Sequence, residues 1–454
     1  MSEWKKVKIG DICKIVKGTT GIASAEPGQY PLVVTAEERK NCATYQFDCE
    51  AVCIPLVSSS GHGKKSLKNV HYQSGKFALG TILCAVIPNN PQELDARYLH
   101  QYLQFYKDTV LVPLMKGAAN VSLSMKDIAT VEFPLPPIER QIELSNLFVS
   151  LQEKQKELSA EYEKQTEYAK HLRQNILQEA TEGKLTADWR KQNPVQKGNP
   201  DYDAEALFEQ IQKGEVSPSL QPASQFSATP SAGSNAARNA RSKSLTPITD
   251  EEKLFEIPEG WKWVRLESIS SNIVDCPHTT PLKSNEKTQY PCIRTSEIQN
   301  GEINWESMQY IDYTEYKKRT ARLIPQKNDI VYAREGAFGD AVLLPEGYNF
   351  SLGQRTMLLR VFINPKYVLN SILSPFLYAQ AINQNRGVTV GHVNVADVKS
   401  FIIPLPQLKE QEEIVNKVEI LLEKVTTLEN QIQERQSLSD KLVFGIIKEN
   451  LEVN

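Results

Sequence analysis

The sequence predicts a mixed α/β, strand-rich fold in which one module occurs twice and each copy is followed by a long helix. The main observation is a repeated segment: residues 133–141 (Phe-Pro-Leu-Pro-Pro-Ile-Glu-Arg-Gln) match residues 403–411 (Ile-Pro-Leu-Pro-Gln-Leu-Lys-Glu-Gln), 270 positions later. Because proline cannot donate to a helix or a central strand, both segments are expected to be extended lead-ins to a helix. A long polar stretch follows each of them.

Further matches between the two halves occur in the same order along the chain. They pair Trp4–Ile9 with Trp261–Leu266, Tyr30-Pro31 with Tyr290-Pro291, Phe77–Gly80 with Phe350–Gly353, Lys116-Gly117 with Arg386-Gly387, and Asp127-Ile128 with Asp397-Val398. A single match could be chance, but a series in register indicates a duplication. Two like modules can pack about a pseudo-twofold axis, and this symmetry would make their long helices antiparallel.

The bulk properties describe a cytoplasmic protein without a membrane segment. With 454 residues, each half is large enough to bury its own core. The chain has no run of 18 apolar residues, and its first residues lack an apolar signal core. The seven cysteines, an odd number without framework spacing, fit a reducing compartment.

The net charge of −3 is unevenly distributed. The two predicted helical stretches, 139–182 and 409–449, each carry nine acidic and six basic side chains. The remainder of the chain is therefore slightly positive, which permits a nucleic-acid partner but is well short of a basic domain.

The first module is expected to contain more strand than helix. Ala51–Val57 and Gly80–Ile87 have the composition of strands, and Leu94–Leu111 has the pattern of a helix. The aromatic side chains of this helix, such as Tyr98 and Tyr102, are more readily explained as packed core than as a stacking surface for bases.

Three cysteines of the first module raise the question of a metal site. Cys42, Cys49 and Cys53 have only His62 as a nearby fourth ligand. Because this spacing matches no zinc pattern, buried thiols are the favoured interpretation and no metal is predicted.

The segment Ser58–Ser66 resembles a phosphate-binding loop only superficially. It lacks the first glycine of that motif and has Lys65 where a hydroxyl must hold magnesium, so nucleotide binding is rejected. The remaining interpretations are a loop that brings Lys64, Lys65 and Lys68 to a phosphate backbone, or an ordinary solvated loop.

Each repeated segment should start a long helix. The first extends from Ile138 to about Glu182, without proline or glycine, and stops at Gly183. Apolar residues at heptad spacing predict a seam in each helix. They are Leu144, Leu147, Leu151, Leu158, Tyr168 and Leu172 in the first helix, and Val418, Leu421, Val425, Leu428 and Ile432 in the second. Neither helix is apolar enough to be stable alone, so each is expected to pack against the other.

A segment rich in Ser, Ala, Pro, Gln and Asn, Val216–Pro247, is predicted to be a linker. The resulting division is 1–137 for the first domain, 138–190 for the central helix, 191–255 for the low-complexity linker, 256–405 for the second domain and 406–454 for the C-terminal helix.

The second module contains a turn, a strand and a glycine-bearing loop over Asn328–Asp340. Arg334 ends the strand, where its guanidinium could contact a guanine edge or a phosphate. A salt bridge to Glu335 or Asp340 is the alternative. Arg386–Asn394 is a second polar loop flanked by glycines, and it corresponds to the loop that begins at Lys116 in the first module.

Two binding surfaces held apart by rigid helices are suited to duplex DNA, because dimeric DNA-binding proteins contact two half-sites through the same symmetry. The motifs then show a family resemblance. The Pro-Leu-Pro-Pro-x-Glu-x-Gln element, Gly183–Trp189 (Gly-Lys-Leu-Thr-Ala-Asp-Trp), the Trp-x-x-Val-x-Leu module start and Asp329–Arg334 (Asp-Ile-Val-Tyr-Ala-Arg) resemble those of specificity subunits of type I restriction-modification systems.

This resemblance implies two target-recognition domains, each recognising one half of a bipartite DNA site, with the helices setting the gap. It implies no catalysis and no cofactor bound by this chain. Its partners would be double-stranded DNA, modification subunits that methylate adenine with S-adenosylmethionine, and restriction subunits that use ATP and magnesium. The absence of a methylation motif and of a complete phosphate loop in the sequence agrees.

The candidate residues follow from these loops and helices. For DNA binding they are Ser60, His62, Lys64, Lys65, Lys68, Lys116, Asn120, Ser122, Arg294, Arg334, Arg355, Arg386, His392 and Asn394. For subunit contact they are Leu151, Leu158, Val418, Leu421, Val425 and Leu428. Two other functions remain open: a coiled-coil adaptor that binds proteins only, and an enzyme whose site is not evident from the sequence.

Overall fold

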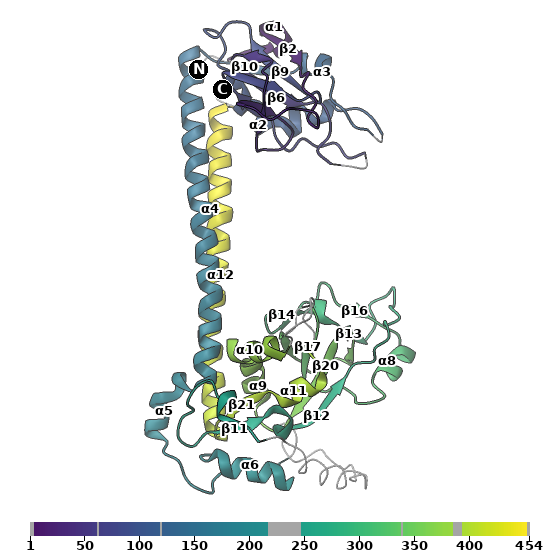
Figure 1. The fold of residues 1–454 in the computed structure, drawn as a ribbon, viewed down its shortest axis with the longest axis vertical. Coiled ribbons are helices and arrows are strands. Elements are labelled where there is room, and N and C mark those ends of the chain that lie inside the picture. The colour runs from purple at the N-terminus through teal and green to yellow at the C-terminus, as the bar shows by residue number, and fades with distance from the viewer. Residues whose placement is uncertain are drawn as a thin grey trace. The chain divides into compact units, whose positions relative to one another are not determined.

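The computed structural model describes residues 4–60, 63–118, 120–216, 247–336, 339–384 and 393–451. The chain forms two compact units, Met1–Lys164 with Ile432–Asn454, and Gln165–Gln431. Each unit contains one module and one stretch of each of the two long helices (Figure 1).

The first module is built on two four-stranded sheets. One is antiparallel with the order β2-β9-β6-β7, and the other has the order β4-β3-β8-β5. In the second sheet β3 runs parallel to β8, with Leu32 opposite Ala78. The strands are β2 (Cys13–Lys17), β3 (Tyr30–Val33), β4 (Lys40–Cys42), β5 (Phe47–Asp48), β6 (Ala51–Pro55), β7 (His71–Gln73), β8 (Lys76–Leu79) and β9 (Leu83–Pro88).

The second module has the same strand order. Its antiparallel sheet is β12-β20-β17-β18, and its second sheet is β16-β13-β19, in which β13 runs parallel to β19 with Cys292 opposite Ser351. The strands are β12 (Ser270–Asp275), β13 (Pro291–Ile293), β16 (Gln309–Tyr310), β17 (Ile330–Ala333), β18 (Ala341–Leu343), β19 (Ser351–Leu352) and β20 (Thr356–Val361), and a hairpin joins β14 (Ile298–Gln299) to β15 (Glu302–Ile303). The predicted duplication is therefore confirmed at the level of topology.

The repeated proline segments form short strands before the long helices. β1 (Lys5–Lys8) pairs with β10 (Glu132–Leu135), and β11 (Lys262–Arg265) pairs with β21 (Ile402–Leu405), both antiparallel. The predicted extended lead-ins are therefore confirmed. They also explain why the Trp-x-x-Val-x-Leu start of each module matches, since it forms the partner strand.

The first turn of each long helix is fixed by the same glutamine. Gln141 Nε2 donates to the Pro136 carbonyl at 2.8 Å, and its Oε1 accepts from the Asp95 N–H at 2.9 Å. Gln411 makes the corresponding bonds to the Pro406 carbonyl at 2.8 Å and from the Asn364 N–H at 3.0 Å. A buried amide in this position joins the proline lead-in to the next helix of its module.

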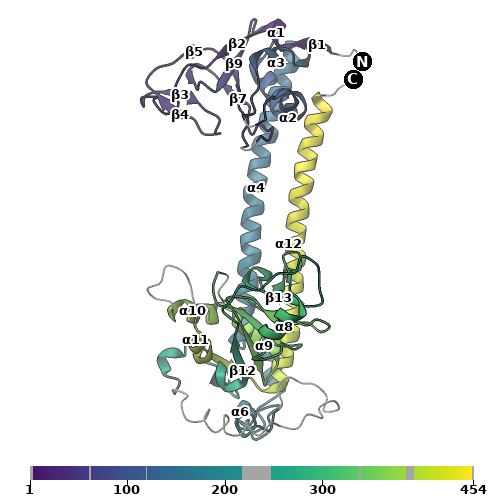
Figure 2. The ribbon, with the colours of Figure 1, turned by 90° about the vertical axis from the view of Figure 1, so that its right-hand side faces the viewer.

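Helices cover the sheets of both modules. In the first module, α2 (Ala96–Val110) lies beside the beginning of α4 (Ile138–Thr181), and Gln101 of α2 donates to the Ser145 carbonyl at 3.0 Å (Figure 2). Asp95 caps α2 by accepting from the N–H groups of Arg97 and Tyr98, as a residue at this position is expected to do. The shorter helices are α1 (Ile9–Ile12), α2 (Ala96–Val110), α3 (Met125–Ala129), α5 (Ala187–Gln192), α6 (Ala204–Lys213), α8 (Tyr313–Arg319), α9 (Pro365–Ile372), α10 (Pro375–Gln384) and α11 (Val395–Ser400).

The long helices are α4 (Ile138–Thr181) and α12 (Leu408–Leu451), each of 44 residues. They are antiparallel within each unit, as predicted. In the first unit Gln155 Nε2 donates to Asp440 Oδ1 at 2.8 Å. In the second unit Arg173 pairs with Glu429 at 2.9 Å.

The predicted heptad seam of α4 is only partly correct. Leu144 is buried, but Leu158 is 42% exposed and Tyr168 is 69% exposed. The better-covered positions of α4 include polar residues such as Gln155 and Arg173, which bond across to α12. The covered positions of α4 also include Ala169 and Ile176, each 6% exposed, which lie in a different heptad register from the predicted leucines.

The linker region contains a helix that the sequence analysis did not predict. Ala204, Leu207 and Ile211 of α6 are buried and belong to the core cluster of the second module. Most of the predicted linker Val216–Pro247 lies outside the described residues.

The cysteines of the first module are placed in apolar surroundings. Cys42 packs in a cluster with Leu32 and Ala78, whereas Cys53 belongs to a different cluster with Phe77. Burial raises the pKa of Cys53, so its thiol stays protonated. Both are the buried thiols that the sequence predicts, while Cys49 is half-buried and His62 lies outside the described residues.

Candidate nucleic-acid interface

Two polar loops of the first module lie side by side. One follows β6 and the other precedes α3. The Leu123 N–H donates to the Leu56 carbonyl at 2.9 Å, and the Ser58 N–H donates to the Val121 carbonyl at 3.0 Å. Two groups of candidate residues that are far apart in the sequence therefore belong to one surface.

The lysine-bearing loop is fixed by its own serines. Ser58 Oγ donates to the Lys64 carbonyl at 2.6 Å and accepts from the Ser66 N–H at 3.1 Å, and Ser59 Oγ accepts from the Lys68 N–H at 2.8 Å. The candidate side chains left exposed are those of Ser60, Lys64, Lys65 and Lys68. The loop thus presents three ammonium groups on a backbone that is held in place.

The second loop adds further polar groups. The side chains of Asn120 and Ser122 are exposed, and Lys116 Nζ lies 3.0 Å from Asp127 Oδ1. Hydrogen bonds from Ser124 and Lys116 hold the pKa of Asp127 below its usual range. His62, the remaining candidate of this module, lies outside the described residues.

Arg334 of the second module is buried, with 6% of its surface exposed. Its Nη1 lies 2.5 Å from Asp275 Oδ1, and its Nε donates to the Val393 carbonyl at 3.1 Å. The contact of Arg334 with DNA therefore stays a prediction, while the ion pair that the structure shows is to Asp275, a partner that the sequence did not indicate.

Two further candidate arginines of this module, Arg294 and Arg355, differ in exposure. Arg294 Nε donates to Glu297, a carboxylate with no exposed surface, at 3.1 Å. The side chain of Arg355 is 63% exposed and its Nε lies 2.8 Å from Glu335 Oε2. Arg355 also has a φ of 66°, a left-handed conformation that is rare for residues other than glycine and is enriched at functional sites.

The last polar loop of the second module is only partly described. Arg386 and His392 lie outside the described residues. Asn394 is exposed at the start of α11, where its N–H donates to Asp397 Oδ2 at 2.9 Å.

The two modules hold their loops through equivalent backbone bonds. The Val393 N–H donates to the Arg334 carbonyl at 3.1 Å, as Leu123 does to Leu56. Leu56 is therefore the counterpart of Arg334 in the first module. Neither this relationship nor the role of Asp275 is evident from the sequence, because nothing local connects Asp275 with an arginine 59 positions away.

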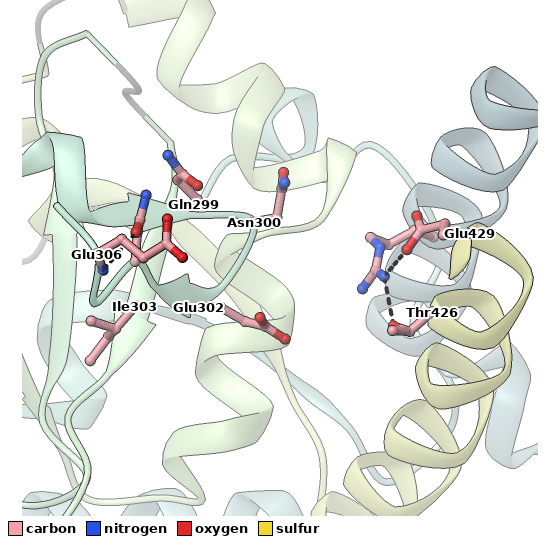
Figure 3. A pocket seen from close by; sticks show the side chains of 9 residues that line it. Gln299, Asn300, Glu302, Ile303, Glu306, Thr426 and Glu429 are labelled. Carbon is pink, nitrogen blue, oxygen red and sulfur yellow. Dashed lines mark hydrogen bonds and ion pairs between the residues drawn. The ribbon is translucent and has the colours of Figure 1, made fainter. Parts of the chain in front are cut away.

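A pocket of about 460 Å³ opens between the β14–β15 hairpin and the long helices within the second unit (Figure 3). Its lining includes Glu302, Glu306 and Glu429, and Arg173 is bonded to Glu429 and Thr426. Three carboxylates would repel a phosphate backbone, so this pocket is not part of the candidate DNA surface.

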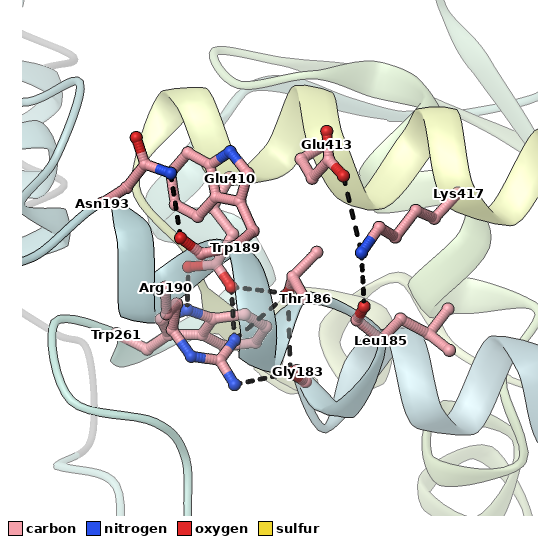
Figure 4. Close-up of polar contacts among 10 residues, drawn as sticks. All are labelled: Gly183, Leu185, Thr186, Trp189, Arg190, Asn193, Trp261, Glu410, Glu413 and Lys417. Atoms are coloured by element: carbon pink, nitrogen blue, oxygen red, sulfur yellow. Dashed lines mark hydrogen bonds and ion pairs between the residues drawn. The ribbon is translucent and has the colours of Figure 1, made fainter.

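The motif at the end of α4 forms a buried polar cluster around Glu410 (Figure 4). Glu410 accepts from Trp261 Nε1 at 2.7 Å and from Thr186 Oγ1 at 2.6 Å, and it pairs with Arg190. The cluster joins the end of α4, the start of the second module and the first turn of α12. Its role is structural, since Glu410 has no exposed surface.

The candidate subunit-contact residues fall into three groups. Leu158 and Leu428 are exposed, at 42% and 45%. Val418 and Val425 are each 1% exposed and pack in the core of the second unit, so a partner could not reach them without rearrangement. Leu151 and Leu421 are partly buried.

Among the described residues, no group of three or more His, Cys, Asp or Glu side chains could hold a metal ion. In the same part of the chain, no helix has the length and apolarity required to cross a bilayer.

Comparison with solved structures supports the fold. One solved structure comes from work on complex assembly and conformational transition of the type I R-M system. It matches 100% of this chain and 98% of the solved chain, with a TM-score of 0.61 and 14% sequence identity. The HsdS subunit from Thermoanaerobacter tengcongensis matches over 100% of this chain and 97% of its own, with a TM-score of 0.50 and 13% identity.

Sequence comparison identifies the family. The chain is 22% identical over 459 residues to the type I restriction enzyme EcoDI specificity subunit of Escherichia coli, covering 98% of this chain and 87% of that protein. It is 27% identical over 203 residues to the EcoAI specificity subunit of the same species, covering 40% of this chain and 32% of that protein. The type I restriction modification DNA specificity domain matches residues 1–167 and 258–435. The chain therefore belongs to this family and is the non-catalytic DNA specificity subunit of a type I restriction-modification system.

Proposed function

We propose that each module recognises one half of a bipartite, asymmetric site in double-stranded DNA, and that α4 and α12 set the gap between the halves. The observation that carries this proposal is the repeated strand order with different loops. At the same point of the sheet the first module has Leu56 and a lysine-rich loop, whereas the second has Arg334 and a glycine-bearing loop. Different loops on one scaffold are expected to recognise different sequences.

The proposed DNA contacts are the exposed candidates on these loops. They are Ser60, Lys64, Lys65, Lys68, Lys116, Asn120 and Ser122 in the first module, and Arg355 and Asn394 in the second. The lysines would contact phosphates and the smaller polar groups would contact base edges. Arg386 and His392 remain proposed contacts on sequence grounds.

The chemistry is assigned to partner subunits. Modification subunits would methylate adenine with S-adenosylmethionine, and restriction subunits would translocate and cleave DNA with ATP and magnesium, while this chain binds none of these cofactors. Exposed apolar side chains of the long helices, including Leu158 and Leu428, are proposed to contact the partners. Because the target is chromosomal or invading DNA, we place the complex in the cytoplasm.

The proposed domain boundaries follow the sequence division. They are 1–137 and 256–405 for the DNA-reading domains, 138–190 and 406–454 for the helices, and 191–255 for the connection, which includes α6.

Mapping methylated adenines tests this function. The chain would be expressed with its modification subunits in a host that lacks the corresponding methylation, and the modified sequence would be determined. We expect a single pattern of two short specific parts separated by a gap of constant length. A continuous pattern, or methylation without sequence preference, would contradict the proposal.

A salt series separates this function from that of a protein adaptor. Binding of the complex to a site-containing duplex should weaken steeply as salt increases, because bound lysines release counterions from the phosphates. Affinity that does not depend on salt or on the site sequence would favour the adaptor.

A further inference from the structure

The buried Arg334 joins four segments at one end of the main sheet of the second module. Its side chain bonds to Asp275, the last residue of β12, and to the Val393 carbonyl. The backbone N–H of Arg334 donates to the Arg355 carbonyl at 2.8 Å. Because neighbouring strands are antiparallel, the end of β12, the start of β20 and the end of β17 meet at this edge.

These segments also carry the exposed polar groups of the module. Arg355 and Asn394 are each next to a segment that Arg334 holds, and both are exposed. His278 Nε2 lies 3.2 Å from Asp275 Oδ2, and its side chain is 71% exposed. Arg334 is therefore a buried residue that connects segments carrying the exposed side chains of His278, Arg355 and Asn394.

The fold itself does not require an ion pair at this position. The first module has Leu56 there and makes the same backbone bond to the following loop. A buried ion pair is expensive to desolvate and is often no more stabilising than apolar residues of similar size. What the pair adds is directional bonding, which fixes the positions of the segments that it connects.

We propose that Arg334 is a positioning residue for DNA recognition: through Asp275 and Val393 it holds the loops that read the second half-site, and it does not contact DNA itself. This inference rests on the proposed function of the second module. It reverses the role that the sequence suggested for this arginine.

The test compares three variants in the complex with its modification subunits. Arg334→Met removes the guanidinium, Asp275→Asn removes only its charged partner, and the double variant Arg334→Met/Asp275→Leu replaces the pair by apolar groups. For each, binding would be measured on DNA with either half-site altered. We expect discrimination at the second half to fall by roughly tenfold or more in both single variants, and recognition of the first half to be unchanged.

The double variant distinguishes positioning from stability. Replacement of the whole pair should restore the melting temperature, because no buried charge is left without a partner. Discrimination at the second half should nevertheless stay relaxed, since all three variants lose the ion pair between Arg334 and Asp275. The dependence of binding on salt should be unchanged, because no phosphate contact is removed.

A matched control lies at the opposite end of the same strands. Arg360 pairs with Asp329 at 2.7 Å, and Asp329 is 2% exposed on its side chain. Arg360→Met/Asp329→Leu replaces a comparable buried pair away from the loops, so it should leave discrimination at both halves unchanged.

Different results would overturn the inference in different ways. If Asp275→Asn keeps full discrimination while Arg334→Met loses it and lowers the salt dependence, Arg334 contacts DNA directly. If the control pair relaxes recognition equally, the effect is one of stability. If the unmodified complex shows no separate response to the two halves, the proposed function fails before the role of Arg334 is tested.

Discussion

Tyr98 and Tyr367 occupy the same place in the two modules, and each hydroxyl donates to a proline carbonyl in the strand before the long helix. The Tyr98 hydroxyl lies 2.9 Å from the Pro134 oxygen, and the Tyr367 hydroxyl lies 2.6 Å from the Pro404 oxygen. Burial raises the pKa of both phenols, so both remain donors. The duplication thus extends to individual hydrogen bonds whose donors, Tyr98 and Tyr367, lie outside the matched sequence segments.

Tyr98→Phe and Tyr367→Phe should each destabilise one module by about 1–2 kcal/mol, because a carbonyl that is partly buried at Pro134 and buried at Pro404 loses its donor. Hydrogen exchange of β10 and β21 would locate the effect in the first and the second module, respectively. Tyr168→Phe, at a residue that is 69% exposed, is the matched control and should have no effect. Equal loss of protection in both modules from either substitution would contradict the assignment.

Glu410→Ala should be among the most destabilising single substitutions in the chain. It leaves Arg190 and the Trp261 N–H without their buried acceptor, at a cost of about 3–5 kcal/mol. Denaturant unfolding would measure this cost, with Glu412→Ala, an exposed position in the same turn, as the control. A loss below about 1 kcal/mol would show that the cluster is not required.

Replacing Lys64 and Lys65 by alanine should weaken DNA binding. The slope of log affinity against log salt concentration should also become shallower, by roughly one for each phosphate that the loop no longer neutralises. The loop backbone is held by Ser58 and Ser59, so folding should be unaffected. The control is Lys156→Ala, an exposed lysine of α4. An unchanged salt slope would remove these lysines from the interface.

Deleting seven residues from each long helix should shorten the tolerated gap between half-sites. Residues 152–158 of α4 and 437–443 of α12 face each other around the Gln155–Asp440 bond, so their joint removal keeps the two helices in register. The shortening is about 10 Å, or about three base pairs. Methylation mapping would measure the gap, and an unchanged gap would show that the helices do not set it.

Acid should destabilise the first module through His71. Burial, followed by the nearby Arg39 charge and by His100, lowers the pKa of His71 from 6.5 to about 4. The unfolded chain therefore binds the proton more readily, so the stabilisation is complete above pH 6.5 and is lost as the pH falls towards 4. The loss is at most about 3 kcal/mol. His71→Asn should flatten the pH dependence of hydrogen exchange in β6 and β7, and His171→Asn on the exposed face of α4 is the control.

The elements with local signals could be predicted from the sequence. The proline lead-ins, the beginning of α4 at Ile138 and the buried strand β6 each follow from residue types that favour one conformation. The duplication could also be predicted from the sequence, because matching residues recur in the same order in both halves.

The contacts between distant segments could not be predicted. Arg334 was expected at a DNA surface because an arginine beside glycines favours that role, but its partner Asp275 lies in another strand. The seam of α4 was assigned to its leucines, whereas Gln155 and Arg173 make the bonds across to α12. In each case the deciding interaction depends on a residue that no local pattern indicates.

The polar bonds between α4 and α12 also restrict how this gene can change. Arg173 meets both Glu429 and Thr426, and a shift of one helix by a few residues would separate an arginine from its acceptors inside a partly covered seam. Leucine packing tolerates such slippage better than a directional bond does. Insertions or losses in one of these helices should therefore persist in related genes only where the other helix, encoded several hundred nucleotides away, carries a compensating change of the same length.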